Sequence, residues 1–322
     1  MAYIVMFYNL ENLYDTVDDP KTADDEYTPQ GGKRWTCERY QQKLSNLSDV
    51  FAAVSSAHNG FPVVVGVSEV ENLGVLQDLA SQKRLSRAHY ECIHFESNDA
   101  RGVDVGMLYR PDKFTLKGCE PVKLVLRSGR EYVGRDILAA WGEIEGEMFA
   151  FYVCHFLSRR AGVAASAGFR RAGAETARDH AAALRKRFPD IKVMVMGDMN
   201  DTPSDESMAL LLKAGKSPFN VPEGAYYNPF WRLAEEGEGT SLHNHHWTLY
   251  DQVVVSHNLL PAWQPEVRGF RLVRFDEKGH YGEIFRRNFM LHKGAPHRSY
   301  YGDTFSGGYS DHLPVLVKIE KR

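Results

Sequence analysis

A carboxylate and an amide directly follow a short apolar segment in KVMVMGDMND, residues 192–201. The four residues before Gly197 have the length and character of a buried strand, and Gly197 interrupts it. Asp198 and Asn200 stand two positions apart, so their side chains point the same way if the backbone stays extended. This pair suits a divalent cation and a phosphate oxygen. Because the same residue types dominate ordinary turns, only partners elsewhere in the chain would indicate a site.

Polar side chains of complementary chemistry also stand at other predicted strand boundaries: Asn9, Glu69, His155, Asp311 with His312, and Asp251 near a strand start. A carboxylate such as Glu69 can hold a hard cation, and an amide such as Asn200 can bind a phosphate oxygen without repulsion. Two histidines can act as general acid and general base because imidazole titrates near neutral pH, and Asp251 can orient one of them. This inventory is typical of a magnesium-dependent phosphoryl-transfer site.

Hydrophobic patterns predict the elements that must position these groups. Strands are expected over 3–8, 63–67, 90–95, 103–109, a pair within 114–126, a hairpin of 137–144 and 148–153, and then 193–196, 250–256 and 313–319. The strands between 90 and 126 are expected to form a meander. Apolar residues at helical spacing predict helices over 38–57 and 169–188, with a short one over 205–214. Segments 15–33 and 215–249 have loop composition. We find no repeat or linker and expect one domain over 1–322.

Composition narrows the class of protein. The chain has 322 residues and 43% hydrophobic content, ample for a sizeable core, and it lacks an apolar run long enough to span a membrane. We expect a cytoplasmic monomer, or an exported, periplasmic protein if the sequence is a trimmed mature form. Four cysteines without CxxC spacing imply neither a disulfide framework nor a zinc ribbon. The net charge of −3 argues against holding long nucleic acid by bulk electrostatics.

Seven motifs, in order along almost the whole chain, resemble the endonuclease/exonuclease/phosphatase superfamily with its DNase I-like fold. They are FYNLENL (7–13), VVGVSEVEN (64–72), RGVDVGMLYR (101–110), the histidine in FYVCHFLSRR (151–160), GDMND (197–201), YDQVVVS (250–256) and SDHLP (310–314). The chain is most similar to a bacterial group whose members read NLENLFD, RGIDVALLYR, GDFND and GGFSDHLP. The resemblance implies an α/β fold, a four-layer sandwich of two mixed β-sheets packed face to face with helices outside.

The resemblance also implies roles for individual residues. Glu69 is expected to be the main ligand of Mg²⁺ or Mn²⁺, with Asn9 and Asp311 in or near the metal shell. Asp198 and Asn200 would position the phosphate and the attacking water. The remaining expected site residues are the pair His312 and Asp251, the second histidine His155, and the phosphate-binding arginines Arg135 and Arg160. We assign His312 to the attacking water or the phosphate and His155 to the leaving group.

Some positions carry competing interpretations. Arg159, Arg160, Arg170 and Arg171 form either a solvated face or a phosphate clamp near His155. Asp104 either orients His155 or faces solvent. The histidines at 243, 245 and 246 resemble a zinc tract but have no acid or cysteine at ligand spacing, so we do not expect a metal there.

The expected function is metal-dependent hydrolysis of phosphodiester bonds, nuclease-like, with a phosphate-ester substrate and possible contact with nucleic acid. A phosphomonoesterase or a lipid- or inositol-headgroup phosphodiesterase is the alternative, and an inactive phosphate-binding module is a rival from another class. Segments 15–35, 215–249 and 268–298 are the candidate specificity segments. The last is the most basic part of the chain, with eight Lys or Arg against three acids.

Overall fold

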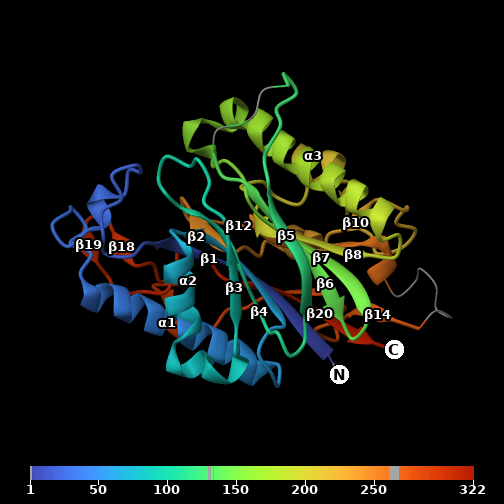
Figure 1. Cartoon of the computed structure of the whole chain (residues 1–322), viewed down its shortest axis with the longest axis horizontal. Coiled ribbons are helices and arrows are strands. Elements are labelled where there is room, and N and C mark those ends of the chain that lie inside the picture. The colour runs from blue at the N-terminus through green and yellow to red at the C-terminus, as the bar shows by residue number, and fades with distance from the viewer. Residues whose placement is uncertain (1, 130–131, 133, 261–267) are drawn as a thin grey trace.

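Two β-sheets packed face to face form the centre of the computed structural model, which describes residues 2–129, 132, 134–260 and 268–322. Helices α1 (Cys37–Ala57) and α2 (Leu73–Ala80) pack on the outer face of one sheet. Helix α3 (Val163–Arg187) packs on the outer face of the other. Figure 1 shows these helices on opposite sides of the molecule. The predicted α/β sandwich is therefore confirmed.

The first sheet, sheet A, runs in the order β14 (Phe270–Val273), β20 (Val315–Lys321), β1 (Ala2–Leu13), β2 (Val64–Val70), β4 (Asp104–Tyr109) and β3 (Glu91–His94), with β15 (Gly282–Ile284) also on β20. Sheet B runs β5 (Thr115–Val122), β6 (Ile137–Ile144), β7 (Glu147–His155), β8 (Lys192–Asp198), β13 (Asp251–Ser256), β10 (Tyr226–Tyr227) and β9 (Ala214–Gly215). Both sheets are mixed, because β1 pairs with β2 in parallel in sheet A, and β7 with β8 and β9 with β10 in sheet B, while the other neighbouring strands are antiparallel.

Short elements complete the described chain. Two-stranded ribbons pair β11 (Ser241–His243) with β12 (His246–Thr248), β16 (Leu291–His292) with β17 (Ala295–Pro296), and β18 (Tyr300–Tyr301) with β19 (Thr304–Phe305). Helix α4 spans Trp231–Glu235, and single helical turns lie at Asp25–Tyr27, Lys83–Ala88, Arg159–Ala161, Ser207–Leu211, His257–Leu259 and Asn288–Met290. None of the described helices combines the length and apolar character that crossing a bilayer requires.

The helices form where their sequence predicts. In α1, the apolar stripe that recurs at three and four residues is fully buried against sheet A. The side chain of Thr36 caps this helix by accepting a hydrogen bond from the Arg39 N–H, and Asn72 caps α2 through the Val75 N–H at 2.9 Å. Burial of one apolar stripe per helix, rather than helix propensity, therefore holds these elements on the sheets.

The two sheets approach closely where β2 crosses β8. A Cβ added to Gly66 would lie 2.7 Å from Met196 Sδ, closer than carbon and sulfur atoms pack, so glycine is what permits the contact. Met196 is fully buried in the core between the sheets. This contact therefore lets the two sheets pack closely near the strand ends that carry Glu69 and Asp198.

The structure corrects several predicted elements. Strand β1 continues through the NLENL motif to Leu13, and α3 begins six residues earlier than expected, at Val163. The expected meander is wrong, since β4 and β5 lie in different sheets and 114–126 supplies one strand rather than two. The expected helix over 205–214 is a single π-helical turn. Segment 215–249 contains β10, α4 and the β11–β12 ribbon, because short elements carry too little periodicity to be recognised.

The Gly66–Met196 contact yields a stability prediction. Gly66→Ala should lower the free energy of unfolding by roughly 1–3 kcal/mol, because the new methyl group overpacks the core. Met196→Ala should cost about 2–5 kcal/mol by leaving a cavity. The double variant should lose less than the sum, since each change relieves the other. Urea denaturation of all three measures this, with Gly60→Ala, which meets no atom within 4 Å, as the control. Strict additivity would contradict the contact.

Candidate functional site

Sheet A contributes Glu69 from an irregular strand end. The pairing of β2 with β4 shifts register between Ser68 and Val70, and Glu69 takes a left-handed backbone conformation with φ 61°. Such a bulge re-aims a side chain that would otherwise alternate along the strand. Asn12, itself at φ 48°, donates its N–H to Glu69 Oε2 at 2.9 Å, and Arg101 Nη2 lies 3.6 Å from Oε1. Burial raises the pKa of Glu69, but Arg101 and neighbouring donors outweigh it and bring the pKa below its usual value.

Sheet B brings three of the expected site residues side by side on adjacent strands. His155, Asp198 and Asp251 are direct cross-strand partners on β7, β8 and β13, so their side chains share one face. Asp251 is fully buried and Asp198 nearly so. Burial raises the pKa of Asp198 to about 7, and the neighbouring Asp251 carboxylate acts in the same direction. Two carboxylates this close cannot both be ionised without a compensating positive charge.

The compensating groups come from the opposite sheet. His312, just before β20, shares a 2.6 Å hydrogen bond between its Nδ1 and Asp251 Oδ2. Asn9 on β1 donates from Nδ2 to Asp198 Oδ2 at 3.1 Å. The Ser310 hydroxyl donates to the Asn9 carbonyl at 2.7 Å and accepts from the His312 N–H, so the SDHLP motif is locked onto β1. Burial lowers the pKa of His312, but Asp251 and Asp198 outweigh it and raise this pKa well above its usual value.

His155 occupies a different electrostatic environment. Its Nε2 lies 3.7 Å from Asp198 Oδ2 and 3.9 Å from Glu69 Oε1, while its Nδ1 is buried and has no hydrogen-bond partner among the residues that the structure describes. Burial, followed by the charges of Arg135 and Arg101, lowers the pKa of His155 well below its usual value. The imidazole is therefore neutral near pH 7, which does not suit the proton-donor role expected from sequence.

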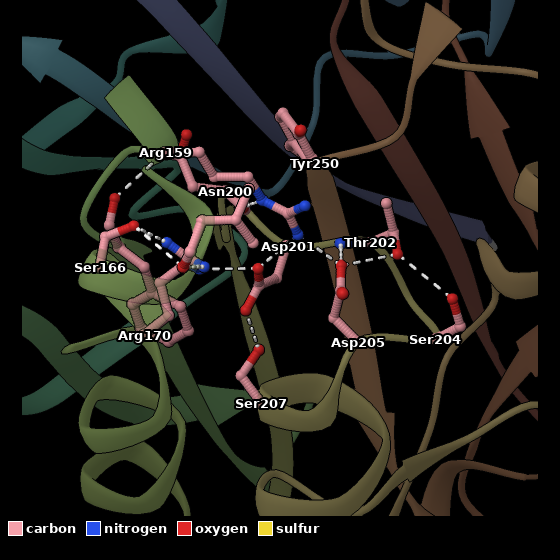
Figure 2. Close-up of polar contacts among 12 residues, drawn as sticks. Arg159, Ser166, Arg170, Asn200, Asp201, Thr202, Ser204, Asp205, Ser207 and Tyr250 are labelled. Atoms are coloured by element: carbon pink, nitrogen blue, oxygen red, sulfur yellow. Dashed lines mark hydrogen bonds and ion pairs between the residues drawn. The ribbon is translucent and has the colours of Figure 1, made fainter. Parts of the chain in front are cut away.

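Asn200 is held by its surroundings rather than by a strand. It lies in the left-handed region at φ 48°, donates from Nδ2 to the Phe156 carbonyl at 3.0 Å, and donates its N–H to Asp198 Oδ1 at 3.0 Å. Figure 2 shows the support around Asp201, the next residue. Its carboxylate accepts from Arg170 Nε and from Ser207 Oγ, each at 2.6 Å.

The arginines near His155 separate into two kinds. Arg159 donates to the Asn200 carbonyl at 2.7 Å and pairs with Asp201 and Asp205, and Arg170 is buried against Asp201, so both are structural (Figure 2). Arg171 pairs with Glu206 on the surface. Arg160 alone of the four has no hydrogen bond or ion pair with any residue in the described ranges. The phosphate-clamp interpretation therefore survives only for Arg160.

Two other expected site residues already have protein partners. Arg135 is buried, donating from Nε to the His155 carbonyl at 3.2 Å and from Nη1 to Asp99 at 3.1 Å. Asp311 accepts from Arg298 Nη2 at 3.0 Å. These contacts make Arg135 a support for the end of β7 as well as a charge beside the site.

The structure decides between the alternative roles of Asp104 and of the histidines in segment 243–246. Asp104 neither contacts His155 nor faces solvent, because it is buried and accepts the Ser97 N–H at 3.2 Å. His243 and His246 face each other as exposed partners on the β11–β12 ribbon. Within the described ranges, the group with metal-ligand spacing is Asp198, Asp251 and His312, whose ligand atoms all lie within 4.8 Å of one another.

Sequence reasoning missed a buried cation behind the site. Lys43 on α1 is almost fully buried, donates from Nζ to Ser299 Oγ and to the Tyr309 carbonyl at 2.6 Å each, and lies 3.4 Å from Glu11 Oε2. Glu11 also accepts the Ser299 N–H at 2.7 Å. The acidic residue within the NLENL motif was the available signal, since a buried carboxylate requires a partner. This cluster ties α1, β1 and segment 298–309 together.

Two mixed sheets packed face to face, with helices outside, define a DNase I-like α/β sandwich. The chain belongs to the endonuclease/exonuclease/phosphatase family, whose family model matches residues 4–321. Members of this superfamily are hydrolases that act on phosphate esters, and they generally depend on divalent metals. The particular bacterial motif group stays a prediction.

Solved structures of low sequence identity share the fold. The human Nocturnin catalytic domain with bound sulfate is 15% identical over 100% of this chain and 95% of that chain, with a TM-score of 0.59. A mannosyl-6-phosphatase of Bacteroides thetaiotaomicron VPI-5482 is 18% identical over 99% of both chains, with a TM-score of 0.57. Truncated Caenorhabditis elegans TDP2 is 14% identical over 99% of this chain and 97% of that chain, with a TM-score of 0.53. A search of curated proteins finds no match.

The His312–Asp251 hydrogen bond yields a pH prediction. Asp251→Asn should keep the shape but remove the charge that raises the pKa of His312, so the imidazole should lose its proton at a lower pH. NMR titration of the His312 ring in the metal-free protein measures this shift directly. Activity on a phosphodiester should fall at least about a hundredfold. Asp190→Asn, at an exposed carboxylate, is the control. An unchanged His312 pKa would contradict the assigned pair.

Proposed function

We propose that this protein is a Mg²⁺- or Mn²⁺-dependent phosphoesterase that hydrolyses phosphodiester bonds. The observation that carries the proposal is the cross-sheet contact of His312 with Asp251 beside Asp198 and Asn9. It brings together a cationic imidazole, a carboxyl group whose pKa lies near neutral pH, and an amide. In-line attack on a phosphate requires this set of groups.

The donor set fits a hard divalent cation. Glu69 would hold the metal, with Asn9 and Asp311 in or near its shell, and all three offer oxygen atoms. The Asp198, Asp251 and His312 group has metal-ligand spacing, but we assign it to proton transfer because Asp251 keeps His312 protonated and a protonated imidazole does not bind a metal. Glu69 suits the role of main ligand because its carboxylate stays ionised despite burial, with Arg101 and the Asn12 N–H offsetting the effect of burial on its pKa. The bound cation would polarise the phosphate and neutralise charge developing on it.

The protein side chains divide the proton transfers between them. Asp198, with a pKa of about 7, can accept a proton from the attacking water near neutral pH. Asn200 would contact a phosphate oxygen without adding charge. His312, which carries a proton at neutral pH, can donate it to the departing oxygen, while neutral His155 would act as a hydrogen-bond partner of the phosphate. This division reverses the roles expected from sequence for the two histidines.

Glu69→Gln tests the metal assignment. The variant should fold but lose metal-dependent turnover by at least about a hundredfold at saturating substrate, because it removes the charge of the proposed main ligand while nearly preserving its shape. Glu71→Gln is a matched control two residues away, since burial raises the pKa of Glu71 to about 8 and its carboxyl is already mostly neutral at pH 7. Near-normal turnover of Glu69→Gln at low Mg²⁺ would remove Glu69 from the site.

The two histidines can be separated by the leaving group. Protonation matters most for a poor leaving group, so His312→Ala should cost at least about tenfold more on the dinucleotide ApA than on bis-p-nitrophenyl phosphate. His155→Ala should harm both substrates about equally. The measurement is kcat for both variants at one pH and metal concentration, with circular dichroism to verify folding. If His155→Ala is instead the variant that loses much less kcat on the nitrophenyl ester than on ApA, the roles expected from sequence are correct.

We expect compact phosphate esters, rather than long nucleic acid, to be the preferred substrates. In the basic segment, Arg286 pairs with Glu238 at 3.0 Å and Arg287 lies 3.8 Å from Glu283, so these charges are already engaged. A substrate panel of plasmid DNA, RNA, bis-p-nitrophenyl phosphate, inositol phosphates and sphingomyelin, run with Mg²⁺ and with EDTA, should therefore show highest kcat/KM on small esters. Metal-independent tight binding without turnover on any ester would instead indicate a phosphate-binding module.

A further inference from the structure

A pocket of about 320 Å³ opens beside Glu69. It shares two residues with the candidate site, because Asn12 donates its N–H to Glu69 and Arg101 lies 3.6 Å from Glu69 Oε1, and both also line the pocket. Its far wall comes from the loop 23–35 and from segment 298–302. These two segments lie side by side in Figure 1, where the first loop meets the β18–β19 ribbon.

The pocket has an excess of positive charge. Lys33, Arg101, Arg160 and Arg298 line it against two carboxylates, Glu11 and Glu26. Three of these cations already contact carboxylates: Lys33 lies 3.0 Å from Asp303, Arg101 lies 3.6 Å from Glu69, and Arg298 lies 3.2 Å from Glu11. An anion entering the pocket would therefore meet three paired cations and Arg160, which has no ion-pair partner among the described residues.

Hydrogen bonds hold the backbone segments that carry these cations, and one of the cationic side chains, in place. The Tyr14 hydroxyl donates to the Arg101 carbonyl at 2.7 Å, and the Tyr300 hydroxyl donates to the Lys33 carbonyl at 2.9 Å. Arg298 is held by Glu11 at 3.2 Å. Cations fixed before a ligand arrives lose less conformational freedom on binding, which is the arrangement of a built anion site rather than of a solvated basic surface.

Arg160 connects the pocket to the reaction centre. It follows the end of β7 by five residues, lines the pocket and has no ion-pair partner among the described residues. Its charge also contributes to the lowered pKa of His155. A guanidinium without an ion-pair partner in the described part of the chain is suited to bind an anion at the pocket, since its fork of donors can contact phosphate oxygens.

We propose that this pocket is a subsite for a second phosphate group, so that the preferred substrates carry one phosphate beside the scissile phosphate ester. The inference rests on the proposed phosphoesterase function and narrows its substrate class. The pocket's volume suits one phosphate with part of a sugar rather than a polymer.

Binding without turnover tests the subsite. The full-length Glu69→Gln protein, in Mg²⁺ buffer, is titrated calorimetrically with matched pairs that differ by one phosphate: glucose 1,6-bisphosphate against glucose 1-phosphate, and ApA with and without a 5′-phosphate. The second phosphate should tighten binding about tenfold in at least one pair. Tighter binding in the sugar pair would mean that the second phosphate belongs to a small substrate. Tighter binding in the dinucleotide pair alone would mean that it belongs to the end of a nucleic acid.

Arg160→Gln, added to Glu69→Gln, should reduce that tenfold ratio to about two or below, whereas the control Arg171→Gln, on the neighbouring surface and paired with Glu206, should preserve it. A ratio near one in the parent, or a ratio that Arg160→Gln leaves unchanged, would overturn the subsite. Turnover by the wild-type protein is scored separately. Hydrolysis of esters without a second-phosphate preference rejects the subsite alone, and a retained preference without hydrolysis rejects the phosphoesterase proposal alone.

Discussion

The hydrogen bond between His312 and Asp251 constrains the rest of the structure. It joins the two sheets where each buries polar groups that need a partner from the other sheet. Asp251 is fully buried, and a buried carboxylate without a compensating partner would be costly. The imidazole comes from the end of sheet A opposite, so the pair forms only when the sheets pack in one register. A second hydrogen bond, from Asn9 on β1 to Asp198 on β8, joins the same two sheets beside this pair.

Backbone conformations that are otherwise unfavourable gather around these contacts. Glu11, Asn12, Glu69 and Asn200 all adopt positive φ values of 48–61°. Each such residue costs free energy, so it persists only where its surroundings determine it. The Asp201 network under Asn200 supplies that support at one point (Figure 2). The Lys43–Glu11 contact supplies it under β1. Buried ion pairs of this kind contribute little net stability but hold one geometry.

We expect substrate specificity to depend on the segments outside the two-sheet sandwich. Structures no more than 18% identical to this chain keep the sandwich over nearly its whole length. The loop 15–35 and the segment that carries Arg298 lie outside the two sheets, and they build the cationic wall beside Glu69. Trp35 and Tyr300 anchor this wall in the core, while the loop residues between such anchors are free to vary more than the polar strand ends.

The sequence by itself determined the parts of the protein that depend on local pattern. The apolar stripe of α1, the hairpin that ends at His155 and the strand before Asp198 all follow from periodicity, and ordered motifs identified the family and its sandwich fold. The tertiary structure decided what depends on contacts between distant segments. It separated β4 from β5, made Arg159 and Arg170 structural, left Arg160 without an ion-pair partner among the described residues, and gave the two histidines opposite pKa shifts. The physical reason is that burial and the sign of neighbouring charges set a side chain's protonation and availability, and both arise only when the sheets pack together.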